Sequence, residues 1–301
     1  MAEYIEIPLY NEDVMIKFYQ LSHQYWVSVK GDKFTRRTGV TTICGIKDKS
    51  IALGMWQQQI TADFLLKKIA AGESITHDLA LEAIVQNDLK LKESVDIGNE
   101  IHDWCSKYIK FKLKEPGYRE MPSMPELKEA VTGVNAFLDW EKENKVKFLS
   151  SERVVYSKKH DFIGTMDIEA MVNGKIALTD LKSGNGLYNS VRAQTAAYVM
   201  ADMEEDKKKK YQVRWAIRVA KLTEEEYFRK EERKKEIKQF IARFQGKEVK
   251  DYPIKPYVAF EAKCLDADES FIDRDFKAFL AHKEVYKWDA LTNPYYIGAN
   301  W

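Results

Sequence analysis

The sequence lacks the features that mark secreted and membrane-spanning proteins. Its three cysteines, Cys44, Cys105 and Cys264, are widely spaced and form no CxxC pair, which argues against a disulfide framework or a zinc site and favours a reducing compartment. No apolar run reaches the length of about 18 residues that a membrane-spanning helix needs. The N-terminal MAEYIEIPLY has no basic segment followed by an apolar one, so we expect no secretory signal.

An excess of charge of one sign is also missing. The 48 Lys and Arg residues nearly balance the 47 Asp and Glu residues, and the formal net charge is +1. Any contact with nucleic acid must therefore come from local basic patches and not from overall charge. The chain has 301 residues, 45% of them hydrophobic and 32% charged, which is typical of a globular protein with an ample core. Because no repeat or low-complexity linker interrupts it, we expect a single domain over 1–301, with a β lead-in at 1–45, a core at 90–220 and a helical extension at 221–301.

Hydrophobic periodicity predicts an α/β fold, with a central mixed β-sheet flanked by helices and a small N-terminal β region. Short alternating runs near the N-terminus predict a small antiparallel sheet, whereas apolar residues spaced by three and four predict amphipathic helices further on. The expected strands are 4–9, 14–19, 25–30, 152–157, 166–172, 175–178 and 211–219. The expected helices are 50–71, 76–84, 93–111, 126–144, 190–202, 223–245 and 270–288.

A hairpin at 166–178 is the most informative stretch. Its two arms meet at Asn173-Gly174, a dipeptide that suits the positive φ angles of a tight hairpin turn. Antiparallel pairing about this turn sets Asp167 opposite Asp180. Lys182 lies two residues beyond Asp180 and therefore points to the same side of the strand. Two carboxylates and one ammonium thus gather on one face.

This arrangement suggests a divalent-metal site. Hard cations such as Mg²⁺ take oxygen ligands and are held by one or two carboxylates together with substrate phosphate. Such an ion can activate a water and neutralise charge on a phosphodiester, and the lysine can hold that water or the phosphate as a point charge. The alternative is a surface hairpin with alternating charges, whose cross-strand pairs are worth only a fraction of about 1 kcal/mol.

Two helices carry further candidates. His102 lies four residues after Gly98, on the same face of the 93–111 helix, and Gly98 inside a helix costs about 1 kcal/mol relative to Ala, which suggests a packing or access requirement. Gln194 and Tyr198 are also four apart and share a face. The ordinary alternative for His102 is a structural histidine. For Gln194 and Tyr198 it is a plain helix surface.

Taken together, these motifs resemble the PD-(D/E)XK nuclease superfamily, and within it the RecB-like branch, which includes phage-type members and the mitochondrial genome-maintenance exonuclease. The motifs follow in the family's order: GxxxH on a helix, a strand with Glu, GxxD, DxK and QxxxY. The resemblance covers about residues 20–220. The matching residues are Gly98 and His102, Glu152, Gly164 and Asp167, Asp180 and Lys182, and Gln194 and Tyr198.

The resemblance implies a role for each residue of the hairpin. His102, Asp167 and Asp180 would be metal ligands, joined by the main-chain carbonyl of Leu181. Lys182 would position or activate the attacking water. The ion implied is Mg²⁺ or Mn²⁺.

The remaining matches have less specific roles. By the resemblance, Gln194 and Tyr198 would orient the lysine or hold substrate phosphate, and Glu152 would assist through water or a second ion. The chain departs from the family pattern at Met166, where the namesake proline is absent, and at Asn99, where threonine is common. Three cysteines cannot supply the four ligands of an iron–sulfur cluster.

The resemblance therefore implies a Mg²⁺- or Mn²⁺-dependent DNA nuclease, an exonuclease that hydrolyses linear DNA in recombination, repair or replication. The alternatives are a structure-specific or nicking endonuclease of the same fold and a non-catalytic DNA-binding relic. The partner expected is single- or double-stranded DNA with a free end, together with a recombinase, helicase or single-strand-binding protein, and no membrane. The expected location is the cytoplasm of a bacterium or a phage-infected cell.

Overall fold

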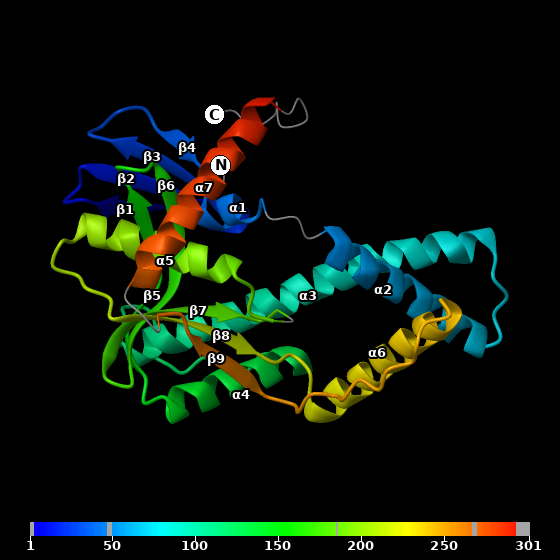
Figure 1. Ribbon diagram of the computed structural model, residues 1–301. Helices are drawn as coiled ribbons and strands as arrows, with labels where there is room; N and C mark the ends of the chain where they lie inside the picture. The colour runs from blue at the N-terminus through cyan, green and yellow to red at the C-terminus, as the bar shows by residue number, and fades with distance from the viewer. Residues whose placement is uncertain (1–2, 47–49, 185, 267–269, 293–301) are drawn as a thin grey trace.

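Two β-sheets organise the chain (Figure 1). The structure is a computed structural model that describes residues 3–46, 50–184, 186–266 and 270–292. It is an α/β protein with mixed β-structure flanked by helices, as the sequence predicts. None of the described helices is long and apolar enough to cross a membrane.

The N-terminal sheet has four antiparallel strands in the order β1-β2-β3-β4. Alternate side chains of β2, among them Ile16, are buried against Val154, Tyr156 and Ile163 of the central sheet. The three strands expected here are confirmed. The fourth, three residues long with no buried side chain, has no hydrophobic pattern to predict it. The strands are β1 (Ile5–Leu9), β2 (Val14–Tyr19), β3 (Gln24–Val29) and β4 (Thr35–Arg37), with a 3-10 turn at Gln20–Ser22 and the short helix α1 at Val40–Cys44.

The central sheet has the order β5-β6-β7-β8-β9. Its strands are antiparallel except for β7 and β8, which are parallel and are joined by the crossover helix α5 (Ser190–Glu205). The bounds are β5 (Lys147–Ser157), β6 (Phe162–Val172), β7 (Lys175–Lys182), β8 (Val213–Val219) and β9 (Phe260–Cys264).

The predicted hairpin is confirmed as β6–β7. Asn173 and Gly174 have φ angles of 49° and 80°, which is the conformation that a two-residue type I′ turn requires. Met171 pairs with Ile176 and Ile168 with Thr179. Continuing that register by one residue sets Asp167 across from Asp180.

Helices cover both faces of the central sheet. On one face, α3 (His77–Lys112) and α4 (Lys128–Glu143) bury a cluster that includes Trp104 and Phe137 against Ile168 and Ile217. On the other face, α1, α5 and α7 (Ser270–Thr292) pack over a second cluster. The candidate residues of α3 and α5 are thereby held over opposite sides of the same strands.

The two helices expected at 76–84 and 93–111 are a single helix, α3. Thr76 caps it as predicted, since its side chain accepts a hydrogen bond from the Leu79 N–H at 3.2 Å. No proline or glycine occurs between residues 85 and 92, so nothing breaks the helix there, and α2 (Ser50–Ala70) packs along this part of it.

The C-terminal region is less purely helical than expected. The capping box of α6 (Glu224–Phe244) is confirmed, with Thr223 and Glu226 bonding each other's backbone N–H groups. The same region also supplies β9, an edge strand that the sequence analysis missed because its burial alternates weakly.

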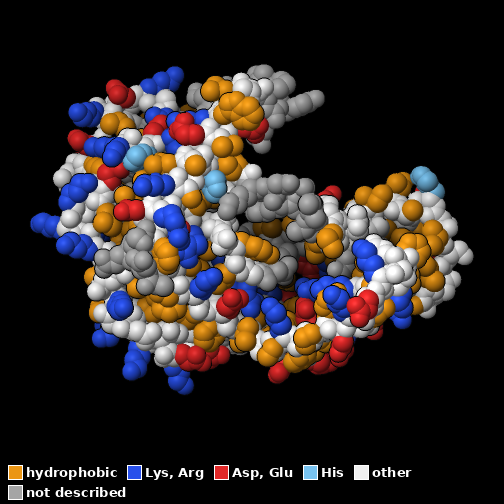
Figure 2. Space-filling view, in the orientation of Figure 1, with side chains coloured by type: hydrophobic (Ala, Val, Ile, Leu, Met, Phe, Trp, Pro, Cys, Tyr) orange, Lys and Arg blue, Asp and Glu red, His pale blue; other side chains and the backbone are white. Residues whose placement is uncertain are grey.

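The helices α2 and α6 and the N-terminal half of α3 form an arm that projects from the sheets (Figure 1). The surface is indented between this arm and the body, and basic and acidic side chains are intermixed over α6 (Figure 2). No side chain of α6 is buried, which agrees with a solvated, charge-balanced helix.

Candidate functional site

Three elements bring potential ligand atoms together at the centre of the molecule. His102 comes from α3, Glu152 from β5 and Asp167 from β6, and one nitrogen or oxygen of each lies within 4.8 Å of the other two. All three side chains are partly buried. Glu152, which the resemblance left in a secondary role, is thus a full member of the cluster.

Asp180 and Lys182 form the adjoining part of the site on β7. The Lys182 Nζ lies 2.6 Å from Asp180 Oδ2, and the Asp180 side chain is almost completely buried. Its Oδ1 has no hydrogen-bond partner within the described ranges. Asp180 is therefore near the three-residue cluster, but it is engaged by Lys182 and does not belong to that cluster.

The backbone of β7 also contacts the cluster. The Leu181 main-chain N–H donates to Asp167 Oδ2 at 2.8 Å, so Asp167 is fixed between its own strand and the next. The predicted ligand set joined His102 and Asp167 to Asp180 and the Leu181 carbonyl. The structure groups Glu152 with His102 and Asp167, and the Asp180–Lys182 pair adjoins them.

Glu152 has an unusual backbone. It lies between the β5–β6 pairs Ser151↔Ile168 and Arg153↔Met166, and so opposite Asp167, yet its φ angle is 52°. A non-glycine residue in the left-handed region costs on the order of 1 kcal/mol or more and is found where the surrounding structure demands it, often at functional sites. The strained residue is therefore one of the three that make up the acidic cluster.

Burial makes the acidic groups reluctant to ionise. Burial and the neighbouring Asp167 raise the pKa of Glu152 to about 8. Burial also raises the pKa of Asp180 to about 6, although Lys182 opposes the change, and it raises the pKa of Asp167 against the pull of Lys182 and of the Leu181 N–H. Carboxyl groups crowded in this way need a positive charge to ionise together.

The pKa values of the two basic groups, Lys182 and His102, shift in opposite directions. Burial disfavours the Lys182 ammonium, but Asp180 and Asp167 outweigh burial and raise the pKa of Lys182. Burial, followed by the charge of Lys182, lowers the pKa of His102 to about 4. At neutral pH the lysine is charged and the imidazole is neutral, which is the form that ligates metals.

Gln194 and Tyr198 lie together on the buried face of α5, where Gln194 Nε2 donates to Tyr198 Oη at 3.2 Å. Burial, and then Asp167 and Asp180, raise the pKa of Tyr198 well above its ordinary value, so the phenol remains a hydrogen-bond donor beside the carboxylates. Neither side chain hydrogen-bonds Lys182 among the described residues.

Gly164 of the GxxD motif is explained by this tyrosine. A Cβ at position 164 would lie 2.4 Å from Tyr198 Cε1, closer than any real contact. The glycine on β6 therefore makes room for the ring on α5, and two separate motifs are one packing unit.

Sequence analysis missed Tyr25, which reaches the site from β3. Its hydroxyl lies 2.8 Å from Thr165 Oγ1, and its pKa is raised by burial and further by Glu152 and Asp167. No local signal marks it, because its place in the site depends on how the N-terminal sheet packs against β6.

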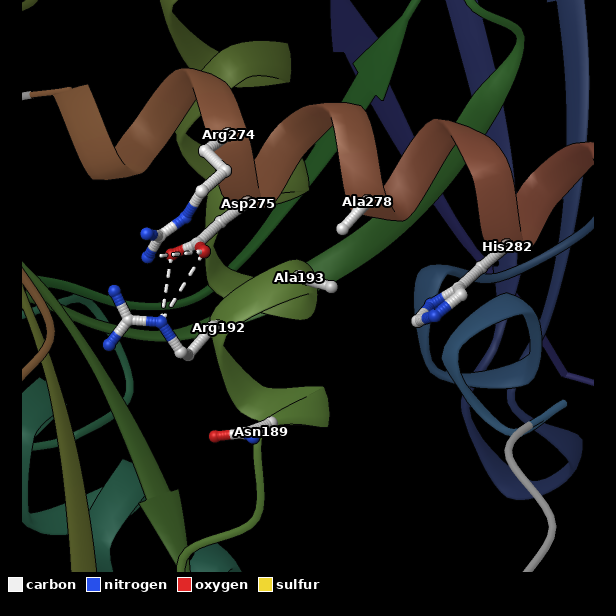
Figure 3. A pocket seen from close by; sticks show the side chains of 7 residues that line it. All are labelled: Asn189, Arg192, Ala193, Arg274, Asp275, Ala278 and His282. Atoms are coloured by element: carbon white, nitrogen blue, oxygen red, sulfur yellow. Dashed lines mark hydrogen bonds and ion pairs between the residues drawn. The ribbon is translucent and has the colours of Figure 1, made fainter.

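A separate pocket of about 390 Å³ lies between α5 and α7 (Figure 3). Its arginines are already paired with a carboxylate, since Arg192 Nε lies 3.1 Å from Asp275 Oδ2 and Arg274 Nη2 lies 3.7 Å from Asp275 Oδ1. None of the predicted site residues lines this pocket. The remaining lining residues are Asn189, Ala193, Ala278 and His282.

No protein-family model matches the sequence, and no curated protein matches it.

Proposed function

We propose that this protein is a Mg²⁺- or Mn²⁺-dependent DNA nuclease of the PD-(D/E)XK superfamily, RecB-like branch, and that it acts as an exonuclease. The observation that carries the proposal is the convergence of His102, Glu152 and Asp167 within 4.8 Å beside the Asp180–Lys182 pair. These residues are distant in sequence and come from four different elements.

The residues present suit a hard divalent cation. Two carboxylates and a neutral imidazole meet in the cluster, and the buried Asp180 Oδ1 next to it has no hydrogen-bond partner in the described part of the chain, a situation that normally costs about 1–3 kcal/mol. His102, Glu152 and Asp167, with Asp180 beside them, would hold the ion. When bound, such an ion lowers the pKa of a water and neutralises charge on phosphate oxygens.

The chain's own groups supply the rest of the chemistry. Hydrolysis forms a bond from water oxygen to phosphorus and breaks the bond to the leaving sugar oxygen, which takes up a proton. The Lys182 ammonium, held 2.6 Å from Asp180, donates a hydrogen bond to the attacking water or to a phosphate oxygen. Tyr198, kept protonated by burial, packs on Gly164 of β6, the strand that carries Asp167.

The fold is consistent with this proposal. The meander β5–β6–β7 and the crossover helix α5, which leads into the parallel strand β8, carry the Glu152, GxxD, DxK and QxxxY motifs on neighbouring elements. A relic that only binds DNA has no need to keep the buried Asp180–Lys182 pair, because replacing both members of such a pair with well-packed apolar groups is often neutral or stabilising.

The test compares cleavage of linear and circular, single- and double-stranded DNA with Mn²⁺. We expect linear DNA to be degraded and circles to survive. Asp167→Asn, Asp180→Asn and Lys182→Met should each lower the rate by at least about 100-fold, with the fold retained by circular dichroism. His102→Ala should lower it less than either carboxylate variant, since charge holds a hard cation better than imidazole does.

The matched control is Lys175→Met, at the exposed opposite end of β7. It should cleave at the wild-type rate. Nicking of circles would assign the endonuclease alternative. Full activity in any site variant, or in excess EDTA, would contradict the proposal.

A further inference from the structure

A second basic group lies at the edge of the site. Because β7 and β8 are parallel, the residues that follow them, Ser183 and Lys221, leave the sheet at the same edge. Both approach α3 at Gly98, where a Cβ would lie 2.8 Å from Ser183 Oγ and 3.8 Å from Lys221 Nζ. Because the glycine of the GxxxH motif has no side chain, these two polar side chains can lie close to the helix surface.

Lys221 has hydrogen-bond acceptors but no counter-ion. Its Nζ donates to Ser94 O at 2.7 Å and to Ser94 Oγ at 3.2 Å, and it makes no ion pair with any residue the structure describes. Arg218, three residues earlier, is paired with Glu261 at 3.2 Å. An ammonium has three donors, so one N–H and the full positive charge of Lys221 are available to a ligand.

The charge of Lys221 lies beside the catalytic cluster and is reinforced from α6. Burial lowers the pKa of Lys221, and the nearby Lys230 lowers it further. Lys221 also lies at Gly98 on α3, one helical turn before His102 and on the same face. Two positive charges that repel each other favour an anion at that place.

We infer that Lys221, supported by Lys230, forms a phosphate-binding subsite that holds a backbone phosphodiester of the nucleic-acid strand next to the cleaved bond. This inference rests on the proposed nuclease function and goes beyond it, because neither lysine belongs to the motifs that carry the resemblance. Lys221 here positions the strand and takes no part in bond breaking.

The experiment measures binding without cleavage. A 5′-labelled 20-nucleotide single strand is titrated with protein in EDTA, and fluorescence anisotropy gives the Kd at several NaCl concentrations. For single strands, each lost phosphate contact lowers the slope of log K against log salt by about 0.7. We expect Lys221→Gln to lower the slope by that amount and Lys230→Gln to lower it less, whereas Lys221→Arg should keep the wild-type slope. Lys175→Gln, exposed at the far end of β7, should change nothing.

The possible results distinguish failure of the phosphate-binding subsite from failure of the proposed nuclease function. If wild-type protein cleaves DNA but both glutamine variants keep the wild-type salt slope, the subsite is overturned and the nuclease proposal stands. If wild-type protein neither binds nor cleaves DNA, the proposed function fails first. If Lys221→Gln does not fold, exposed Lys230→Gln decides, because its substitution removes charge without removing a buried contact.

Discussion

Glu152 combines a strained backbone with a carboxyl group that resists ionisation. Its φ of 52° stands inside a regular strand, and its pKa is raised to about 8 by burial and by Asp167. Strain and desolvation both lower the stability of the folded protein. A group that is costly in both ways is retained where something other than stability requires it.

The raised pKa predicts how stability depends on pH. In the unfolded chain Glu152 loses its proton near pH 4.5, but in the folded protein it does so only near pH 8. The folded state therefore binds more protons in this window, and stability falls as pH rises through it and levels off above it. Asp180, with a pKa of about 6, acts in the same direction at lower pH, and His102, with a pKa of about 4, acts in the opposite direction below its ordinary value of 6.5. Between pH 6.5 and 8 the Glu152 carboxyl loses its proton in the folded protein, whereas the unfolded chain has already lost it.

We expect the free energy of unfolding in EDTA to decrease between pH 6.5 and 8, and Glu152→Gln to flatten this dependence. Urea denaturation followed by circular dichroism at each pH measures it. Glu143→Gln, exposed on α4, should keep the wild-type slope. A wild-type stability that rises across this window would contradict the assignment.

The sequence predicts which residues are candidates for the site better than it predicts which of them lie together. Asp167 opposite Asp180 follows from the turn at Asn173-Gly174 and the two-residue period of strands. The conformation of Glu152 has no such signal, because the run SSERVV contains no glycine or asparagine that would favour a positive φ. Tyr25 reaches the site only through packing between two sheets.

At the scale of elements, α5 packs closely on β6 because Gly164 has no side chain. Gly164 lies under the Tyr198 ring, and both belong to motifs that sequence analysis treats separately. The ring is fully buried among Val40, Phe162 and other members of its cluster, so it has no space into which to retreat. The position of α5, and with it the donors of the site, depends on this contact.

Gly164→Ala should therefore destabilise the protein by about 1–3 kcal/mol, the usual cost of overpacking a core, and should reduce activity by displacing Tyr198. Urea unfolding gives the free-energy change. The control is Gly54→Ala on α2, where a Cβ meets nothing within 4 Å; it should stabilise by roughly 0.5–1 kcal/mol, because alanine is the better helix former. Equal effects from the two substitutions would refute the packing argument.

Elements with strong periodicity are predicted and those with weak patterns are not. The β6–β7 hairpin, β8 and the cap of α6 follow from turn residues, a buried run and Thr223 with Glu226. The continuity of α3 cannot be predicted from local sequence signals, since the middle of this helix is polar and is held by packing against α2. The edge strand β9 gains its order from β8, a partner 41 or more residues earlier in the chain.

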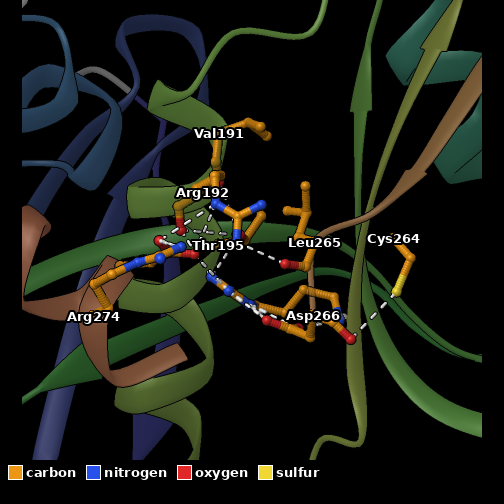
Figure 4. A network of polar contacts seen from close by, with 9 residues as sticks. Val191, Arg192, Thr195, Cys264, Leu265, Asp266 and Arg274 are labelled. Carbon is orange, nitrogen blue, oxygen red and sulfur yellow. Dashed lines mark hydrogen bonds and ion pairs between the residues drawn. The ribbon is translucent and has the colours of Figure 1, made fainter. Parts of the chain in front are cut away.

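At the scale of the whole molecule, Arg214 ties the C-terminal part of the chain to the central sheet. Figure 4 labels two of its partners, Arg192 and Asp266. Its side chain is fully buried in β8, with Nη2 2.6 Å from Asp266 Oδ1 and 2.8 Å from Asp275 Oδ2 on α7. Its Nη1 also donates to the Arg192 carbonyl on α5 at 2.8 Å. One cation thus joins the sheet, the segment after β9 and two helices.

The same strand offers a comparison that separates a buried charge from an exposed one. Arg214→Met leaves the buried Asp266 carboxylate without its cation, while Asp275 keeps Arg192; breaking a buried pair in this way costs about 3–5 kcal/mol. Arg218→Met, also on β8, removes a pair whose Glu261 side chain is 50% exposed, and it should cost no more than about 1 kcal/mol. Urea denaturation of both variants measures the difference. If α7 were held by its apolar contacts alone, the two substitutions would lower the free energy of unfolding by similar amounts. A difference of about 2 kcal/mol or more would assign the attachment of the C-terminal helix to this ion network.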